Sequence, residues 1–246
     1  MDIRTFLRKA VKTVIGKAPQ ETANTYAGHE DPKIQIKLLL DAIKNPVIFE
    51  IGAHMGTDTK WFHENAVNPT IHCFEPDPRN ADILRKSGVD KLPGVFFNEA
   101  AVGSVSGVAN FHLSTGKRPD PNYTFDHTDS SSLREPTPEM MERFKWISFQ
   151  QKAQVQVFTL DDYCEKNKID SIYFIWADTQ GAEVDVIKGG QKMLAKTRYL
   201  FTEYCDIPMY EGQINYEEIL KILPGKWRVI KKYVDDVLLE NVSLRT

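Results

Sequence analysis

The feature that most constrains the fold of this chain is a regular alternation of short apolar runs with segments of helical periodicity. The runs at residues 47–51 and 172–177 are almost wholly apolar and rich in β-branched and aromatic side chains, as strands buried on both faces are. Repeated strand–helix alternation predicts an α/β fold with a mostly parallel central sheet and helices on both faces. Residues 228–234 and 237–244 predict a C-terminal antiparallel hairpin.

The remaining elements follow the same rhythm. Strands are also predicted at residues 70–74, 95–98, 108–113, 155–158 and 199–202. Helices are predicted at residues 34–43, around Trp61, and at 79–87, 160–167, 182–188 and 216–223.

One large domain is predicted, preceded by a separate segment. Residues 1–18 hold five basic side chains against Asp2, with apolar residues at helical spacing, which predicts a basic amphipathic helix. Residues 19–32 contain prolines and a glycine and are predicted to be a linker, and residues 33–246 form a single domain. The helix either packs on this chain or a second copy, the interpretation we favour, or lies on an anionic membrane surface.

An insertion at about residues 114–150 interrupts the alternation. It holds four prolines, a run of three serines and five aromatic residues. Long irregular segments inside compact α/β domains are usually functional, and disordered loops are poor in aromatic residues. We therefore expect a lid or acceptor-binding loop rather than a surface excursion.

Composition excludes several classes of protein. A net charge of -3 and a pI near 6.1 argue against a nucleic-acid-binding protein. The three cysteines are far apart and lack CxxC spacing, which argues against disulfides and zinc and fits a cytoplasmic protein. The longest apolar run is far shorter than the roughly 18 residues of a membrane-spanning helix, so any contact with the inner membrane face would be peripheral, through residues 1–18.

The strand ends carry the first indication of a ligand. Gly52 and Gly56 follow the first strand, where the chain must turn tightly, and Glu75 ends the second strand. Ligands of open α/β sheets bind at the carboxyl ends of the strands, and an acid after the second strand can accept hydrogen bonds from both ribose hydroxyls. These positions predict a nucleoside-binding crevice, although the glycine spacing differs from that of dinucleotide-binding sites.

Several motifs in this sequence resemble one family, the FkbM-type S-adenosylmethionine-dependent methyltransferases of the class I methyltransferase fold. The resemblance covers roughly residues 45–205. The motifs that carry it are VIFEIGAHMG at 47–56, HCFEP at 72–76, NEAAVG at 98–103, SSL at 131–133, TLD at 159–161 and ADTQGAEVDVIKG at 177–189. The family mostly methylates hydroxyl oxygens, often on sugars or secondary metabolites.

The resemblance implies a Rossmann-like fold and a role for each matching residue. Asp178, after the fourth Rossmann-type strand, would lie beside the transferring methyl group, and Trp176 stands where the family often has lysine. Glu75 would hold the donor's ribose. Residues that would line other parts of the donor site are Glu50, Gly52, Ala53, His54 and Gly56 near the methionine, and Glu99 and Ala100 near the adenine.

The reaction requires a base for the acceptor hydroxyl. Asp178 is the first candidate, with His127 in the insertion and His54 as weaker ones; alternatively, Asp178 only caps the helix at 182–188. Asp178, Glu203 and Asp206 could together hold a divalent metal such as Mg²⁺, but we favour a metal-free reaction.

The candidate acceptor-binding residues are Ser131, Ser132 and Glu203.

Other functions remain open from the sequence alone. The alternatives to an O-methyltransferase are an NAD-linked Rossmann oxidoreductase and a non-catalytic nucleoside-binding protein.

Overall fold

The computed structural model describes residues 31–119 and 126–244. The predicted helix at residues 1–18 and most of the linker at 19–32 lie outside the described residues. Helix α3 (Pro32–Asp41) begins at the end of that linker. No helix within the described ranges is long and apolar enough to cross a membrane.

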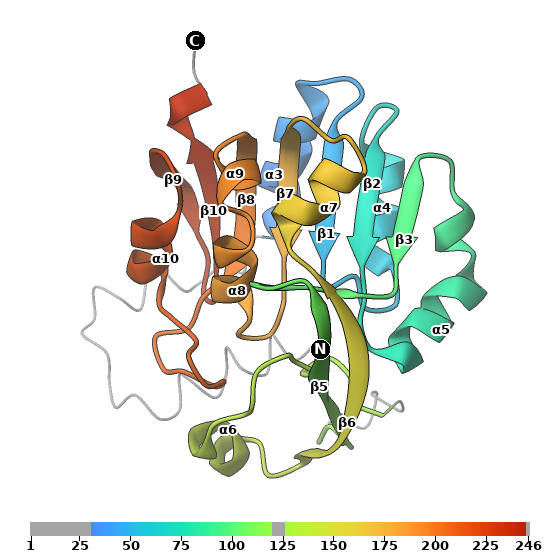
Figure 1. Cartoon of the computed structure of the whole chain (residues 1–246), viewed down its shortest axis with the longest axis vertical. Coiled ribbons are helices and arrows are strands. Elements are labelled where there is room, and N and C mark those ends of the chain that lie inside the picture. The colour runs from blue at the N-terminus through green and yellow to red at the C-terminus, as the bar shows by residue number, and fades with distance from the viewer. Residues whose placement is uncertain (1–30, 120–125, 245–246) are drawn as a thin grey trace.

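The central layer, as far as the structure describes the chain, is a seven-stranded sheet with the order β3-β2-β1-β7-β8-β10-β9 (Figure 1). The pairs β1–β2, β2–β3, β1–β7 and β7–β8 are parallel, whereas β10 is antiparallel to both of its neighbours. The mostly parallel sheet and the C-terminal hairpin are therefore confirmed. The strands are β1 (Val47–Ile51), β2 (Thr70–Phe74), β3 (Val95–Asn98), β7 (Ile172–Ala177), β8 (Thr197–Glu203), β9 (Trp227–Lys232) and β10 (Asp236–Asn241).

Helices cover both faces of the sheet, as predicted. Ile36, Phe62 and Leu84 of α3, α4 and α5 are buried against one face, and Leu160 and Ile219 of α7 and α10 are buried against the other. In Figure 1, α7 lies in front of the sheet and α3 behind it. The helices besides α3 are α4 (Thr57–Asn65), α5 (Pro78–Ser87), α7 (Leu160–Lys166), α8 (Glu183–Lys188), α9 (Gln191–Leu194) and α10 (Tyr216–Ile222).

The predicted insertion is more regular than the sequence suggests. Strands β5 (Gly107–Gly116) and β6 (Ile147–Phe158) pair antiparallel and form a small sheet with β4 (Ala101–Val102). Helix α6 (Pro138–Arg143) lies between them in the chain. The first half of β6 escaped prediction because its side chains are mostly exposed or half-buried, so it shows no continuous apolar run.

The small sheet lies next to the carboxyl edge of the central sheet (Figure 1). The chain runs from β1 outward through β2 and β3, and then returns to add β7 on the other side of β1. Such a reversal is where ligands bind in open α/β sheets. The edge is tied together by hydrogen bonds from Gly52 N to Phe74 O (3.0 Å) and from Asp178 N to Ile51 O (2.9 Å).

Candidate active site

The turn after β1 requires glycine at two positions. Gly52 has a φ of +94°, and a Cβ there would lie 1.9 Å from the carbonyl oxygen of Asp178. Gly56 has a φ of +82°, and a Cβ there would meet Leu84 Cγ at 3.0 Å. Any side chain at Gly52 would push apart the ends of β1 and β7, so the predicted glycines keep these two strand ends together.

Glu75 follows β2 and is almost fully buried, with 5% of its surface exposed. Its Oε2 accepts a hydrogen bond from His54 N (2.7 Å), and its Oε1 accepts one from Asp77 N (2.8 Å). Burial raises the pKa of the Glu75 carboxyl to about 7. The two main-chain donors fix the carboxylate at the sheet edge, and each oxygen has a second lone pair that a ligand hydroxyl can use.

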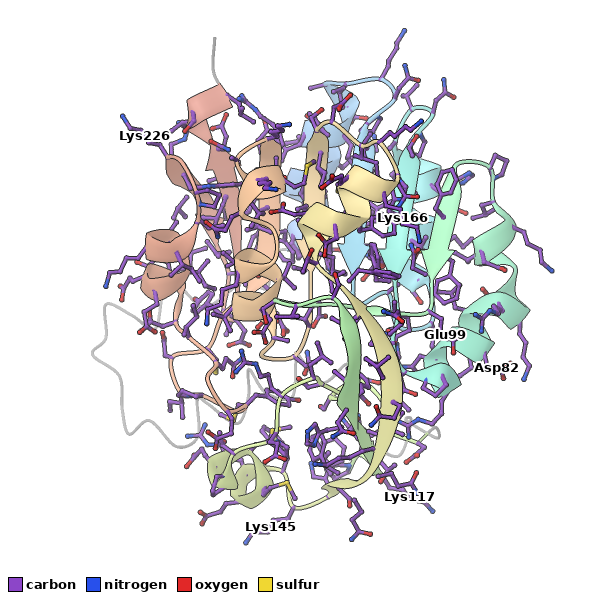
Figure 2. The ribbon with its side chains drawn as sticks, viewed as in Figure 1. Asp82, Glu99, Lys117, Lys145, Lys166 and Lys226 are labelled. Atoms are coloured by element: carbon purple, nitrogen blue, oxygen red, sulfur yellow. The ribbon has the colours of Figure 1, made fainter. Side chains whose placement is uncertain are left out.

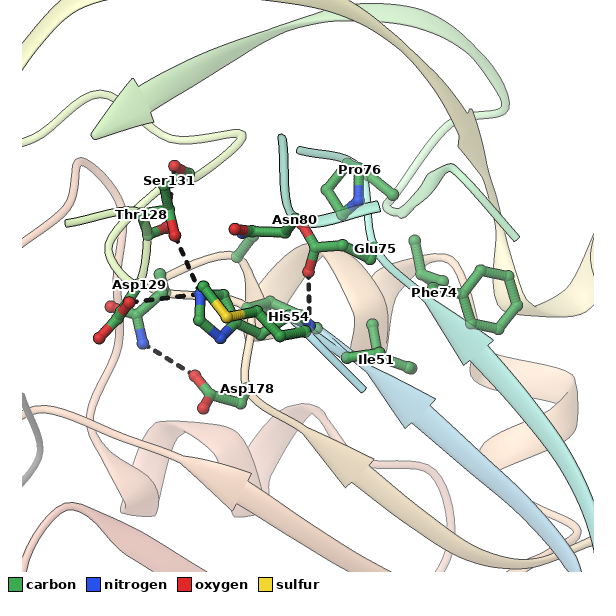
Figure 3. Close-up of a pocket in the computed structure, with 18 of the residues that line it drawn as sticks. Ile51, His54, Phe74, Glu75, Pro76, Asn80, Thr128, Asp129, Ser131 and Asp178 are labelled. Carbon is green, nitrogen blue, oxygen red and sulfur yellow. Dashed lines mark hydrogen bonds and ion pairs between the residues drawn. The ribbon is translucent and has the colours of Figure 1, made fainter. Parts of the chain in front are cut away.

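A cavity of about 360 Å³ opens beside Glu75 (Figure 3). Ligand pockets commonly have volumes of roughly 300–1,000 Å³. The turn after β1, the ends of β2 and β7, and residues 128–131 contribute its polar wall. Ala100, strand β4, Phe111 of β5 and Leu133 of the insertion contribute apolar side chains to the wall.

Asn80, on α5, supplies a hydrogen-bond acceptor to this cavity. It is 2% exposed, and its Oδ1 is buried without a hydrogen-bond partner among the described residues. Figure 3 shows its side chain beside Glu75. A buried acceptor without a partner is costly, so Asn80 favours a ligand with a hydroxyl or amino donor at this point.

Asp178 lies directly after β7 and lines the cavity (Figure 3). Its Oδ1 accepts a hydrogen bond from Gln180 Nε2 (2.8 Å), which also donates to Glu203 Oε2 (3.1 Å). Gln180 adopts a left-handed φ of 53°. Helix α8 has Ala182, not Asp178, as its N-cap, and no side-chain capping bond is formed there within the described ranges.

The candidate metal ligands do not fit a metal site. Asp178 and Glu203 are bridged by the amide of Gln180, and Asp206 is exposed. Among residues 31–119 and 126–244, no group of three His, Cys, Asp or Glu side chains could hold a metal ion.

His54 connects the turn after β1 to the insertion. Its Nε2 lies 3.0 Å from Thr128 Oγ1 and 3.3 Å from Asp129 Oδ1, and Arg118 also pairs with Asp129, at 2.9 Å. Burial acts to lower the pKa of His54, but the hydrogen bond to Asp129 and nearby carboxylates outweigh it and raise the pKa. Burial acts to raise the pKa of Asp129, but His54, His127 and Arg118 lower it to about 2. Because the pKa of His54 is raised, its pair with Asp129 stabilises the contact between the turn after β1 and residues 128–129 below the ordinary histidine pKa. This stabilisation is lost as pH rises through the raised pKa.

Replacing Asp129 by Asn is expected to lower the pKa of His54, because the carboxylate charge is removed while the burial remains. An NMR titration of the His54 ring measures this. Asn keeps an oxygen acceptor for Arg118. The control is Asp126→Asn in the same segment, whose exposed carboxylate lies near Arg79; it should leave the His54 titration unchanged. An unchanged titration in Asp129→Asn would show that the pair is not formed in solution.

His127 is placed differently from the sequence hypothesis. It is fully buried and does not line the cavity. Its Nε2 lies 2.8 Å from Ser130 Oγ, its ring packs edge-on against Trp146, and burial lowers its pKa to about 4. A neutral, enclosed imidazole cannot reach an acceptor in the cavity, so we do not propose His127 as a base.

The two candidate acceptor-binding serines have different surroundings. Ser131 lines the cavity, and its Oγ donates to Asp77 Oδ2 (2.9 Å). Ser132 is fully buried, and its Oγ donates to the main-chain oxygen of Gln180 (2.7 Å). Ser132 therefore holds the turn after Asp178, and only Ser131 borders the cavity.

Two acids expected to contact the donor lie outside the cavity wall. Glu50 is buried behind it and accepts a hydrogen bond from Thr59 Oγ1. Glu99 pairs with Arg85 at the flank of the sheet (Figure 2). Its neighbour Ala100 does line the cavity, as do Ala53 and His54.

Neither the packing of Trp176 nor the contacts of Gln180 could be predicted from the sequence. Trp176, where the family resemblance led us to expect lysine, is 2% exposed and packs against Phe62 and Phe201 in the core. Gln180 belongs to the motif at residues 177–189, but the sequence does not predict its contacts to the carboxylates of Asp178 and Glu203. No sequence pattern predicted Asn80 or Asp129 as site residues. Each lies beside the cavity only because the fold packs distant segments of the chain together.

Comparisons with known proteins relate the chain to methyltransferases. The model of the methyltransferase FkbM domain matches residues 50–233. The chain is 36% identical over 214 residues to the 2-O-methyltransferase NoeI of Sinorhizobium fredii, a match that covers 85% of each chain. Among solved structures it is similar to an O-methyltransferase from Bacillus cereus in complex with SAH, at 13% identity, 94% coverage of both chains and a TM-score of 0.45.

The structure combines a mostly parallel α/β sheet with a cavity at the carboxyl edge of that sheet. The chain belongs to the FkbM methyltransferase family. It is therefore an S-adenosylmethionine-dependent methyltransferase rather than an NAD-linked oxidoreductase. The cavity fits this donor, because Glu75 and Asn80 Oδ1, which has no partner within the part of the chain that the structure describes, offer acceptors to a nucleoside beside an apolar wall.

Proposed function

We propose that this protein transfers the methyl group of S-adenosylmethionine to a hydroxyl group of a sugar or glycan acceptor. Transfer to oxygen is supported by the FkbM family and by the 36% identity to a protein named as a 2-O-methyltransferase. The observation that carries the proposal is one cavity that joins a nucleoside-binding acid, Glu75, to a carboxylate at the end of β7, Asp178.

In this proposal each residue has a distinct task. Glu75 and Asn80 bind the nucleoside of the donor, which supplies an electrophilic methyl group on a sulfonium. Asp178 orients the acceptor hydroxyl and takes its proton as the oxygen–carbon bond forms and the carbon–sulfur bond breaks. Gln180 keeps the Asp178 carboxylate in place through the 2.8 Å hydrogen bond.

The acceptor side is proposed to lie against the segment at residues 128–131. Thr128, Asp129 and Ser131 line the cavity and offer hydroxyl and carboxylate groups suited to a sugar. Ser132 and Glu203 act indirectly, since both bind Gln180. Closure of this segment over the cavity limits water at the transferring methyl, which strengthens electrostatic interactions there.

Methyl transfer to a sugar hydroxyl can be measured directly. The protein is incubated with donor labelled with carbon-13 in its methyl group and with a panel of monosaccharides and oligosaccharides. We expect release of S-adenosylhomocysteine together with an NMR signal of an O-methyl group on a sugar carbon. A labelled methyl on nitrogen or sulfur would contradict the proposed acceptor, and donor binding without turnover of any acceptor tested would favour a non-catalytic nucleoside-binding protein.

A further inference from the structure

A salt bridge between Lys33 and Asp58 lies in the wall of the cavity. Lys33 Nζ is 2.5 Å from Asp58 Oδ1, and the two side chains are 26% and 27% exposed. Both residues line the cavity, although neither is adjacent to Glu75 or Asp178 in the sequence. The pair therefore presents one positive and one negative group to the same space.

Lys33 is held in place by its helix. The side chain of Asp31 caps α3 by accepting a hydrogen bond from Lys33 N (2.9 Å). Ile36 and Leu40 of α3 are fully buried, and Tyr173 donates a hydrogen bond to Leu39 O (2.7 Å). The Lys33 ammonium also lies 5.3 Å from the centre of the Trp61 ring. This packing fixes where the lysine enters the cavity.

Apart from Lys33, the charged groups around the pair include the carboxyl groups of Glu50, Asp58 and Glu75. Asp58 acts to raise, and Lys33 to lower, the pKa of the buried Glu50, whose raised pKa is mainly due to burial. Of the described residues that line the cavity, Lys33 and His54 have side chains that can be cationic, and His54 is engaged by Asp129. Among the described side chains, Lys33 is therefore the cation best placed to pair with an anionic ligand group on this side of the cavity.

The order of the strands places the pair at one end of the site. The cavity wall follows the order of strands β3, β2 and β1 along the sheet edge. Apolar Ala100 lies after β3, Glu75 lies after β2, and Asp58 lies in the helix after β1. The donor has the same order of parts: an aromatic base, a ribose, and an α-amino acid with one carboxylate and one ammonium.

We propose that Lys33 and Asp58 form the binding subsite for the amino-acid end of the donor. Lys33 Nζ pairs with the α-carboxylate, and the Asp58 carboxylate pairs with the α-ammonium. A partly exposed ion pair contributes little to the stability of the fold. Lys33 and Asp58 can therefore each form a new ion pair with a zwitterionic ligand at little cost to the protein. This inference rests on the proposed function and adds two residues to its donor site.

Calorimetric titrations of the full-length protein with two ligands test this subsite. S-Adenosylhomocysteine carries the amino-acid end, whereas 5′-methylthioadenosine has the same base, ribose and a thioether but lacks it. Lys33→Met is expected to weaken binding of S-adenosylhomocysteine about 10- to 100-fold and to leave binding of 5′-methylthioadenosine unchanged. Asp58→Asn, which keeps the size of the side chain, is expected to show the same selectivity.

Lys60→Met is the matched control, because Lys60 lies on the same helix as Asp58, is 61% exposed and pairs only loosely with Glu64 at 3.8 Å. It should bind both ligands as the wild type does. Unchanged binding of S-adenosylhomocysteine by Lys33→Met and Asp58→Asn would overturn the subsite, as would equal losses for both ligands. A wild-type protein that binds neither ligand would instead overturn the proposed function, and the subsite with it.

Discussion

Replacing Asp178 by Asn is expected to lower kcat by about 10²- to 10⁴-fold while donor affinity is retained. The amide that replaces the carboxylate cannot take the proton of the acceptor hydroxyl. Asn keeps an Oδ1 that can accept the hydrogen bond from Gln180, now 2.8 Å long, so the turn should be preserved. Single-turnover kinetics with an identified acceptor, together with calorimetry with S-adenosylhomocysteine, measure the two quantities separately.

Asp206→Asn is the control for this prediction, since Asp206 is exposed beyond the end of β8. It should leave kcat and donor affinity unchanged. A nearly normal kcat in Asp178→Asn would reject Asp178 as the base and direct attention to His54, because His127 is enclosed. Activity that a chelator abolishes and Mg²⁺ restores would instead assign Asp178 to a metal.

Replacing Glu75 by Ala is expected to weaken binding of S-adenosylhomocysteine by about 10- to 100-fold, which corresponds to the loss of charge-assisted hydrogen bonds worth about 1.5–3 kcal/mol. The same change removes the acceptor for the main-chain N–H groups of His54 and Asp77. Calorimetry gives the affinity, and a thermal unfolding curve shows whether the variant is folded.

Glu99→Ala is the matched control, because Glu99 also follows a strand of the central sheet but pairs with Arg85 outside the cavity. Its donor affinity should equal that of the wild type. If folded Glu75→Ala binds S-adenosylhomocysteine as tightly as the wild type, the donor does not use this acid. If Glu99→Ala is the weaker variant, the nucleoside lies nearer to β3 than we propose.

The centre of the main sheet was predictable because strands β1 and β7 are buried on both faces. Residues 47–51 and 172–177 read as apolar runs for this reason, and both became strands with the predicted bounds. The small sheet was only partly predictable. Strand β6 (Ile147–Phe158) has many exposed side chains, and its backbone is ordered by pairing with β5, a contact between distant segments that no local pattern encodes.

The site divides in a similar way. Gly52, Glu75 and Asp178 could be predicted because each directly follows a strand, and parallel strands bring their carboxyl ends to one edge. Asn80, Lys33 and Asp129 could not, since helices or the insertion carry them to the cavity. His127 shows the converse error: its place in the insertion suggested a reactive histidine, but packing against Trp146 encloses it.

A crystal structure of the protein with S-adenosylhomocysteine is the most direct test of the central claim that the cavity between Glu75 and Asp178 is the methyl-transfer site. We expect the ribose hydroxyls within hydrogen-bonding distance of the Glu75 carboxylate, the base against the apolar wall that includes Ala100, and the sulfur on the side of Asp178. Ligand bound outside this cavity, or bound with its ribose away from Glu75, would contradict the account.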